Sequence, residues 1–459
     1  LGEGVDVTVE MIELYQEGKR QGWTKAEYLR RAAQIRGLYI PSLYEITYHA
    51  DGTVASITPK DGAPATITKR IVQDLDESYF PTDTIVPSTE IVHDRVMLEL
   101  FRGCIRGCRF CQAGFCYRPV RPKSRDVLIR QGIEACQASG YQEMTLSSLS
   151  SSDYRQLEGL CDGLLDYCTP RNINLNLPSL RADGFSMSIM EKLQRARKSS
   201  ITFAPEAGTQ RLRDAINKNV TEEDLLSSCR TVFEGGCNAV KLYFMLGLPT
   251  ETDEDVLGIA DLANKVYLCW RQYAATRARG IRITVSTSFF VPKPFTPFQW
   301  EAQIDLEEYQ RRVQLLRGAI TNKSIIYNWH DPDTSYLEAV FARGDRRLGQ
   351  VIEEAWRNGA KFDAWSEYFD LERWLAAFRT CGVGPDFYAR RERSYEEVLP
   401  WSHISVGVRP AYFWRERNQA YQSAITPDCR VQCMGCGADK LLQCGKCDEP
   451  LTRRERGEA

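Results

Sequence analysis

The chain has 459 residues, of which 43% are hydrophobic and 26% are charged, and its 59 Lys and Arg nearly balance its 61 Asp and Glu. This length suits a large α/β unit with additions, and the composition excludes global disorder and a polycation that coats nucleic acid. No apolar run has the length of a membrane span, and the first residues lack a secretion signal, so we expect a cytoplasmic protein without a membrane partner. Because the chain begins at Leu1 as if in mid-domain, we expect further natural sequence upstream.

Residues 1–92 are predicted to form an N-terminal connecting module. Apolar residues at helical spacing predict helices over residues 8–20 and 24–35. A turn at Asp51-Gly52 predicts a hairpin over residues 43–59.

From residue 93 the pattern changes to short apolar strands, each followed by a helical stretch. Intervals of roughly thirty to forty-five residues are typical of βαβ units, and six such units can close most of a barrel. The predicted fold class is therefore α/β, with a partial (β/α)6 TIM-type barrel of parallel strands over residues 93–300. In such barrels the chemistry lies at the carboxyl ends of the strands. The predicted strands are residues 95–101, 143–149, 173–179, 200–206, 239–246 and 281–290.

The part after the barrel is predicted to be a helical extension over residues 301–425. The preceding stretch, 291–300, is too rich in proline to continue a central strand. Apolar residues at helical spacing after acidic starts predict helices over 305–320, 345–359 and 370–382. Residues 426–459 are predicted to be a Cys-rich metal-binding tail.

Three cysteines follow the first predicted barrel strand. Cys104, Cys108 and Cys111 have the spacing C-x3-C-x2-C. Three soft thiolates suit an iron–sulfur cube and leave one iron without a protein ligand, whereas structural zinc normally takes four protein ligands. The spacing therefore favours a cluster that binds an outside molecule. The alternative is a zinc site completed by Cys116 or Cys136.

The stretch GCIRGCRFCQAG, with an aromatic residue before the last cysteine, resembles the signature of the radical S-adenosylmethionine (radical SAM) superfamily. Residues 203–225 and 240–256 resemble the fourth and fifth strand motifs of radical SAM proteins near the methylthiotransferases, and residues 288–300 resemble the sixth. The resemblance runs from about Asp94 to Trp300. The C-terminal part resembles the extension of one bacterial subfamily whose reaction is unassigned and whose members usually carry a cobalamin-binding-like domain upstream.

This resemblance implies an enzyme with a [4Fe-4S] cluster on Cys104, Cys108 and Cys111 and with S-adenosylmethionine (SAM) on the unique iron. One electron, from a donor such as flavodoxin or ferredoxin, would split SAM and give a 5′-deoxyadenosyl radical. Similar barrels suggest a macromolecular substrate, RNA or protein, and methyl or methylthio transfer. The resemblance also makes cobalamin a candidate cofactor, bound by the domain expected upstream.

The resemblance and the predicted strand positions together select side chains for SAM. The serines at 147 and 148 stand where the superfamily commonly has Gly-Gly-Glu, which is a departure from the pattern. Glu206 has a second interpretation as an acid favoured by a helix N-terminus, and Lys241 as a cation that points away from the barrel. The predicted SAM-contacting residues are Phe110, Ser147, Ser148, Arg181, Glu206, Lys241, Phe289 and Val291.

The tail contains a second set of cysteines, Cys429, Cys433, Cys436, Cys444 and Cys447. The last four could form a zinc-ribbon-like structural site. Alternatively the first three, with one later cysteine, could hold an auxiliary iron–sulfur cluster. The repeated C-x3-C-x2-C spacing favours the cluster.

The remaining features have less specific interpretations. Residues 117–125 and 271–282 are basic and could contact RNA phosphates, although such runs are more often solvated surface. The rival functional hypothesis is a non-enzymatic zinc or iron–sulfur binding module that holds RNA or protein. Isolated cysteines are expected to be small buried hydrophobic residues. These are Cys161, Cys168, Cys229, Cys237, Cys269 and Cys381.

Overall fold

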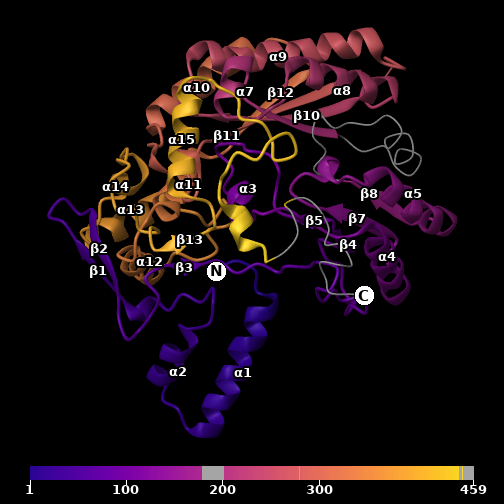
Figure 1. Ribbon diagram of the computed structural model, residues 1–459. Coiled ribbons are helices and arrows are strands. Elements are labelled where there is room, and N and C mark those ends of the chain that lie inside the picture. Colours follow the sequence, from indigo (N-terminus) through magenta and orange to yellow (C-terminus); the bar gives the residue numbers. More distant parts are fainter. Residues whose placement is uncertain (178–200, 279, 444–446, 448–459) are drawn as a thin grey trace.

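The computed structural model describes residues 1–177, 201–278, 280–443 and 447 and has an α/β fold (Figure 1). Parallel strands form two sheets, with the strand orders β4-β7-β8 and β12-β11-β10-β9. All six predicted barrel strands are confirmed, and a seventh, β12, follows them. The strands are β4 (Val96–Glu99), β7 (Glu143–Ser147), β8 (Asn174–Asn176), β9 (Ile201–Glu206), β10 (Ala239–Leu246), β11 (Arg282–Phe289) and β12 (Ile325–Trp329).

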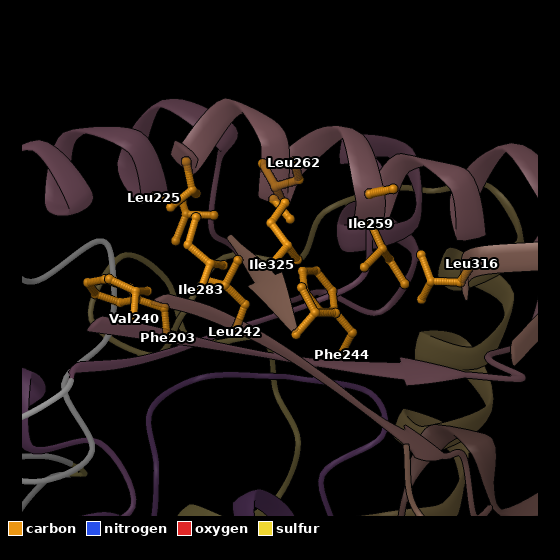
Figure 2. Close-up of a cluster of buried hydrophobic side chains, with 14 of the residues drawn as sticks. Phe203, Leu225, Val240, Leu242, Phe244, Ile259, Leu262, Ile283, Leu316 and Ile325 are labelled. Atoms are coloured by element: carbon orange, nitrogen blue, oxygen red, sulfur yellow. The ribbon is translucent and has the colours of Figure 1, made fainter. Parts of the chain in front are cut away.

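Strand β10 shows why the two faces of the larger sheet differ. Val240, Leu242 and Phe244 are buried, whereas Lys241 and Tyr243 between them are exposed. Because side chains alternate across a strand, the buried set faces the helices and the exposed set faces the interior of the partial barrel. Figure 2 shows the buried set against side chains of α8 and α9. Each such side chain stabilises the fold by about 1.5–3 kcal/mol through burial.

Helices alternate with the strands and cover the outer face of the sheets. Helix α8 begins at a capping box in which the side chains of Thr221 and Asp224 each bond the other residue's backbone N–H. In Figure 1, α8 and α9 lie over one face of the sheet that contains β10 and β12. The covering helices are α4 (Arg125–Ser139), α5 (Leu157–Cys168), α8 (Glu222–Glu234), α9 (Asp253–Tyr273) and α10 (Leu306–Ala319). Two short helices, α3 (Gln112–Cys116) and α7 (Gln210–Ala215), pack instead with residues of the C-terminal extension.

The seventh strand was not predicted because its sequence lacks a strong strand pattern. Of its five residues only Ile325 is buried, and β12 is the last strand in its sheet order. An edge strand needs less apolar alternation than a central one, since only one neighbour pairs with it. The parallel sheet therefore continues beyond residue 300, where the barrel was predicted to end.

The N-terminal module has the predicted helices and hairpin. Strands β1 and β2 pair antiparallel, and the turn between them contains Gly52 at φ 85°. Strand β3 pairs in parallel with β13 of the C-terminal part, so the module is attached to the extension. In Figure 1, α1 and α2 project away from the sheets. The elements are α1 (Val5–Gln21), α2 (Lys25–Ala32), β1 (Tyr44–Tyr48), β2 (Val54–Pro59), β3 (Ile67–Thr68) and β13 (Ile404–Ser405).

The C-terminal extension is mainly helical, and the three helices predicted there are confirmed as α10, α12 and α13. Helix α15 was not predicted; its Trp414 contacts Trp300 of the barrel edge with ring centroids 5.1 Å apart. Within the described ranges, none of the helices combines the length and apolar character that a membrane crossing requires. The helices are α11 (Pro332–Ala342), α12 (Leu348–Arg357), α13 (Leu371–Thr380), α14 (Pro385–Ala389) and α15 (Pro410–Tyr421).

Candidate radical SAM site

The cysteine loop, residues 103–120, leaves the sheet just after the carboxyl end of β4. The short strands β5 (Phe101–Arg102) and β6 (Arg121–Pro122) pair antiparallel and close the base of this loop. Gly103 has φ 92°, and a Cβ at this position would lie 2.8 Å from the carbonyl oxygens of Tyr117 and Pro119. Only glycine fits such a position, because the backbone is left-handed and the opposing atoms are backbone. The predicted placement of the loop at the carboxyl edge agrees with the structure.

The three thiols of the loop lie within each other's electrostatic influence. Burial, followed by Cys108, raises the pKa of Cys104 to about 12. Burial and Cys108 likewise raise the pKa of Cys111. The site therefore disfavours free thiolates, and a bound iron cluster would offset this because a cation stabilises deprotonated sulfur. This donor chemistry fits the cluster implied by the sequence.

The described residues include no group of three or more His, Cys, Asp or Glu side chains close enough together to hold a metal ion. The assignment of the loop to an iron–sulfur cluster therefore depends on its thiol donors and their spacing, and not on a preformed ion site. The ligand roles of Cys104, Cys108 and Cys111 stay predictions.

An ion pair between Glu206 and Lys218 lies beside the last cysteine of the loop. Lys218 Nζ is 3.1 Å from Glu206 Oε1, and the side chains are only 12% and 16% exposed. Lys218 Nζ also lies 6.0 Å from the ring centroid of Phe110. Lys218 lowers the pKa of Cys111 and Glu206 raises it, although burial has the larger effect. A carboxylate and an ammonium group at this place can receive the two charged ends of an amino acid.

The backbone around this pair is unusual. Glu206 has φ 70°, a left-handed conformation that costs a non-glycine residue energy and that concentrates at functional sites. Lys218 was not predicted from the sequence. It lies between Asn217 and Asn219, each with φ 52°. Because asparagine tolerates this conformation, the sequence Asn-Lys-Asn was a signal for a sharply turned segment that presents the lysine.

The serine segment after β7 lies next to the cysteine loop. Ser147 pairs in register with Glu99 at the end of β4. Ser148 Oγ lies 2.9 Å from Ser151 Oγ. Nearby, Asp153 accepts from Arg106 of the cysteine loop at 2.5 Å, which ties the two segments together. The predicted site residue Arg181 lies outside the described residues.

The structure places the other predicted SAM contacts on β10, on β11 and directly after β11. Lys241 faces the barrel interior between Thr202 and Thr284 in register, but it precedes the end of β10 by five residues, which is about 16 Å. Phe289 stacks on Tyr309 with ring centroids 4.2 Å apart. Val291 packs in a separate apolar cluster with α11. The contact of Phe289 and Val291 with SAM stays a prediction.

The tail packs against the cysteine loop. The backbone N–H of Cys429 donates to the carbonyl of Ile105 at 3.3 Å. Burial raises the pKa of Cys447 to about 12, with smaller contributions from Cys429, Cys436 and Cys433. Cys444 lies outside the described residues, so the choice between an auxiliary cluster and a zinc ribbon stays a prediction.

The remaining cysteines behave as apolar residues. Two cysteines were candidates for a fourth zinc ligand. Cys136 is buried near Cys168. Burial raises the pKa of Cys116, and Cys116 is close enough to Cys111 for that thiol to raise it further. All of the isolated cysteines belong to apolar clusters or pack against them, but only three are buried as predicted, and the other three are half-buried. The buried ones are Cys161, Cys168 and Cys229, and the half-buried ones are Cys237, Cys269 and Cys381.

The basic stretch 117–125 does not form a solvated surface. Arg118, Arg121 and Lys123 are all buried, and Arg121 donates to the carbonyl of Val72 at 2.6 Å. This burial corrects both interpretations, as an RNA contact and as an exposed charge run, for these three residues, whereas Arg125 is exposed. The charges instead join the cysteine loop to the N-terminal module.

The chain is similar to several known proteins. An uncharacterized protein of Methanocaldococcus jannaschii is 28% identical over 337 residues, which are 73% of this chain and 70% of that protein. The threonylcarbamoyladenosine tRNA methylthiotransferase of Treponema pallidum is 26% identical over 194 residues, 39% of each chain. Among solved structures, the radical SAM methyltransferase TsrM of Kitasatospora setae has a TM-score of 0.40 and 15% identity, over 62% of this chain and 50% of that one.

The family model of the Radical SAM superfamily matches residues 98–263. This range contains the cysteine loop, the serine segment and the Glu206–Lys218 pair. The match assigns residues 98–263, which are less than half of the chain, to a radical SAM domain and supports an enzyme.

Proposed function

We propose that the chain cleaves SAM at a [4Fe-4S] cluster held by Cys104, Cys108 and Cys111, and uses the resulting radical to modify a macromolecule. The observation that carries this proposal is the C-x3-C-x2-C loop at the carboxyl edge of the sheet, with the half-buried Glu206–Lys218 pair beside Cys111. When bound, the cluster supplies the electron that breaks the C5′–S bond of SAM. The electron donor would be a protein of the flavodoxin or ferredoxin type, in a cytoplasmic setting that keeps the thiols reduced.

The protein's own part is to bind and orient SAM and to exclude water. Glu206 would accept a hydrogen bond from the ammonium group of the methionine moiety, and Lys218 would pair with its carboxylate. We propose further contacts to the methionine moiety from Arg181, Ser147 and Ser148. The low exposure of the ion pair strengthens these interactions, since fewer water molecules compete for the same charges.

RNA is the substrate that we propose, with methyl or methylthio transfer as the reaction. The support is the similarity to an enzyme whose name states that it acts on tRNA. The described part of the basic stretch 271–282 has exposed Arg271, Arg277 and Arg282, but it precedes β11 and so lies at the amino ends of the strands. It is therefore not the surface that would bring RNA to the cysteine loop. A protein substrate is the alternative outcome of the test below. If the reaction is methyl transfer, we propose cobalamin as an additional cofactor.

We further propose that the tail holds an auxiliary iron–sulfur cluster. Its ligands would be Cys429, Cys433, Cys436 and Cys447, the set whose charges influence one another. Zinc in the tail is the alternative outcome.

Anaerobic reconstitution followed by iron, sulfide and zinc analysis tests both metal sites. We expect iron and sulfide at the loop, formation of 5′-deoxyadenosine from SAM with a strong reductant, and loss of this product in Cys108→Ala. Cys381→Ala is the matched control, because Cys381 packs in an apolar cluster of the extension. Zinc at both sites, or 5′-deoxyadenosine from Cys108→Ala, would contradict the proposal. Incubation with separate tRNA and protein fractions, followed by mass analysis, identifies the substrate class.

A further inference from the structure

Arg109 lies between the second and third cysteines of the loop, and its side chain is fully buried. Its exposed fraction is 0%, and that of its partner Glu416 on α15 is 2%. Arg109 Nε and Nη2 donate to Glu416 Oε2 at 3.3 and 3.1 Å. A residue of the C-terminal extension, 307 positions away in the sequence, thus supplies the countercharge inside the cysteine loop.

The guanidinium also bonds two other segments. Nη1 donates to the carbonyls of Ala215 and Asp214, at the end of α7, at 2.9 and 3.2 Å. Nη2 donates to the carbonyl of Ala424 at 2.8 Å and to Thr426 Oγ1 at 3.2 Å. All donor groups of the side chain therefore have acceptors, in a fixed planar geometry that lysine cannot reproduce.

The acceptors form a network that returns to the loop. Thr426 Oγ1 donates to Glu416 Oε2 at 2.8 Å, and the N–H of Thr426 donates to Asn217 Oδ1 at 2.9 Å. Asn217 Nδ2 in turn donates to the carbonyl of Gly107 at 3.1 Å. The network holds the loop at Gly107 and Arg109, on both sides of Cys108, and the segment that leads into the tail is part of it.

We propose that Arg109 and Glu416 are positioning residues that make the conformation of the cluster loop depend on the C-terminal extension. This inference rests on the proposed function, because it assigns the loop to the cluster. A buried charge pair of this kind is a weak source of net stability, but removal of one partner leaves the other charge unpaired and buried. The pair therefore fixes the path of the chain between Cys108 and Cys111 more than it stabilises the fold.

The test uses Glu416→Gln, which keeps the shape and removes the charge, and Arg109→Lys, which keeps the charge and removes the planar donors. Arg343→Lys is the matched control, since Arg343 is also fully buried and donates to the carbonyls of Ala389 and Arg391 in the extension. Amide hydrogen exchange of the peptide covering the cysteine loop is measured without metal. EPR spectra and the reduction potential of the cluster are measured after reconstitution.

We expect exchange in the loop at least tenfold faster in both variants than in the wild type and in Arg343→Lys, and an altered EPR spectrum with lower iron occupancy. Unchanged exchange in the loop in both variants would overturn the inference, whatever the wild type does with SAM. Conversely, a wild type that fails to cleave SAM contradicts the proposed function alone, because the exchange measurement does not depend on cluster, SAM or substrate.

Discussion

Gly208 allows the segment after Glu206 to lie directly against helix α9, and replacing it with alanine tests how closely the site depends on this packing. A Cβ at Gly208 would lie 2.7 Å from the carbonyl carbon of Gly258 and closer still to the backbone of Asp255 and Ile259. An ordinary carbon–carbon contact needs about 3.5 Å, so the two backbones must separate by about 0.8 Å or more. These atoms are backbone, and no side-chain rotation can relieve the clash.

The expected loss of unfolding free energy in Gly208→Ala is about 3 kcal/mol. Overpacking of this kind typically costs about 1–3 kcal/mol. The separation would also weaken the hydrogen bond from Thr209 Oγ1 to the Asp255 carboxylate, and a hydrogen bond to a charged group contributes about 1.5–3 kcal/mol. For a domain of roughly 200 residues, about 3 kcal/mol lowers Tm by about 6–12 °C.

Thermal unfolding monitored by circular dichroism measures the change in Tm. Equilibrium dialysis measures whether the affinity for SAM changes with it. SAM affinity should fall together with Tm, because the displaced segment carries Glu206. Gly318→Ala is the matched control: Gly318 lies in α10, where an added Cβ would meet no atom within 4 Å, and alanine there should stabilise the helix by about 0.5–1 kcal/mol. If Gly208→Ala unfolds within about 1 °C of the wild type while the control behaves as expected, the close approach at Gly208 is not as tight as argued.

Three further changes separate the parts of the proposed site. Lys218→Met should weaken SAM binding about tenfold or more, since a charged hydrogen bond contributes about 1.5–3 kcal/mol. Lys218→Arg should recover part of this affinity. An unchanged SAM affinity of Lys218→Met in equilibrium dialysis would refute the pairing of Lys218 with the carboxylate of SAM. Lys241→Ala should not change the cleavage of SAM in the absence of substrate, but it should reduce substrate modification. Loss of 5′-deoxyadenosine formation in this variant would contradict the placement of Lys241 away from SAM. Burial lowers the pKa of His403 from 6.5, with a smaller contribution from Arg346. The unfolded state therefore binds more protons than the folded state as pH falls through 6.5, and stability decreases there. His403→Phe should flatten this dependence in urea titrations between about pH 7 and pH 5, and an equally steep dependence would exclude His403 as its source.

The sequence was sufficient for the succession of strands and the position of the cysteine loop. Strands such as β10 have a buried apolar face, and their regular alternation with helices left few arrangements to consider. The edge strand β12 was missed because Ile325 alone is buried in it. Local patterns therefore identified the elements that carry strong local signals.

The composition of the site was predicted less well, since it depends on contacts between distant segments. Glu206 was selected by its place at the end of a strand, but its partner Lys218 became visible only when the turn around Asn217 brought the two together. Phe289 was predicted to contact SAM from its place at the end of a strand, and the structure adds that its ring stacks on Tyr309 of α10. Such a contact between distant segments cannot be read from the alternation of side chains along one strand.

The predicted boundaries between barrel, extension and tail do not separate independent structural units. A boundary at residue 300 separates elements along the chain, but β12 pairs with β11 across it and Glu416 bonds Arg109 across it. The tail begins at Thr426, which bonds the same glutamate, and Cys429 bonds Ile105 of the loop. A barrel that ended at residue 300 would leave the buried charge of Arg109 without its countercharge. The extension is therefore part of the structure that holds the cysteine loop.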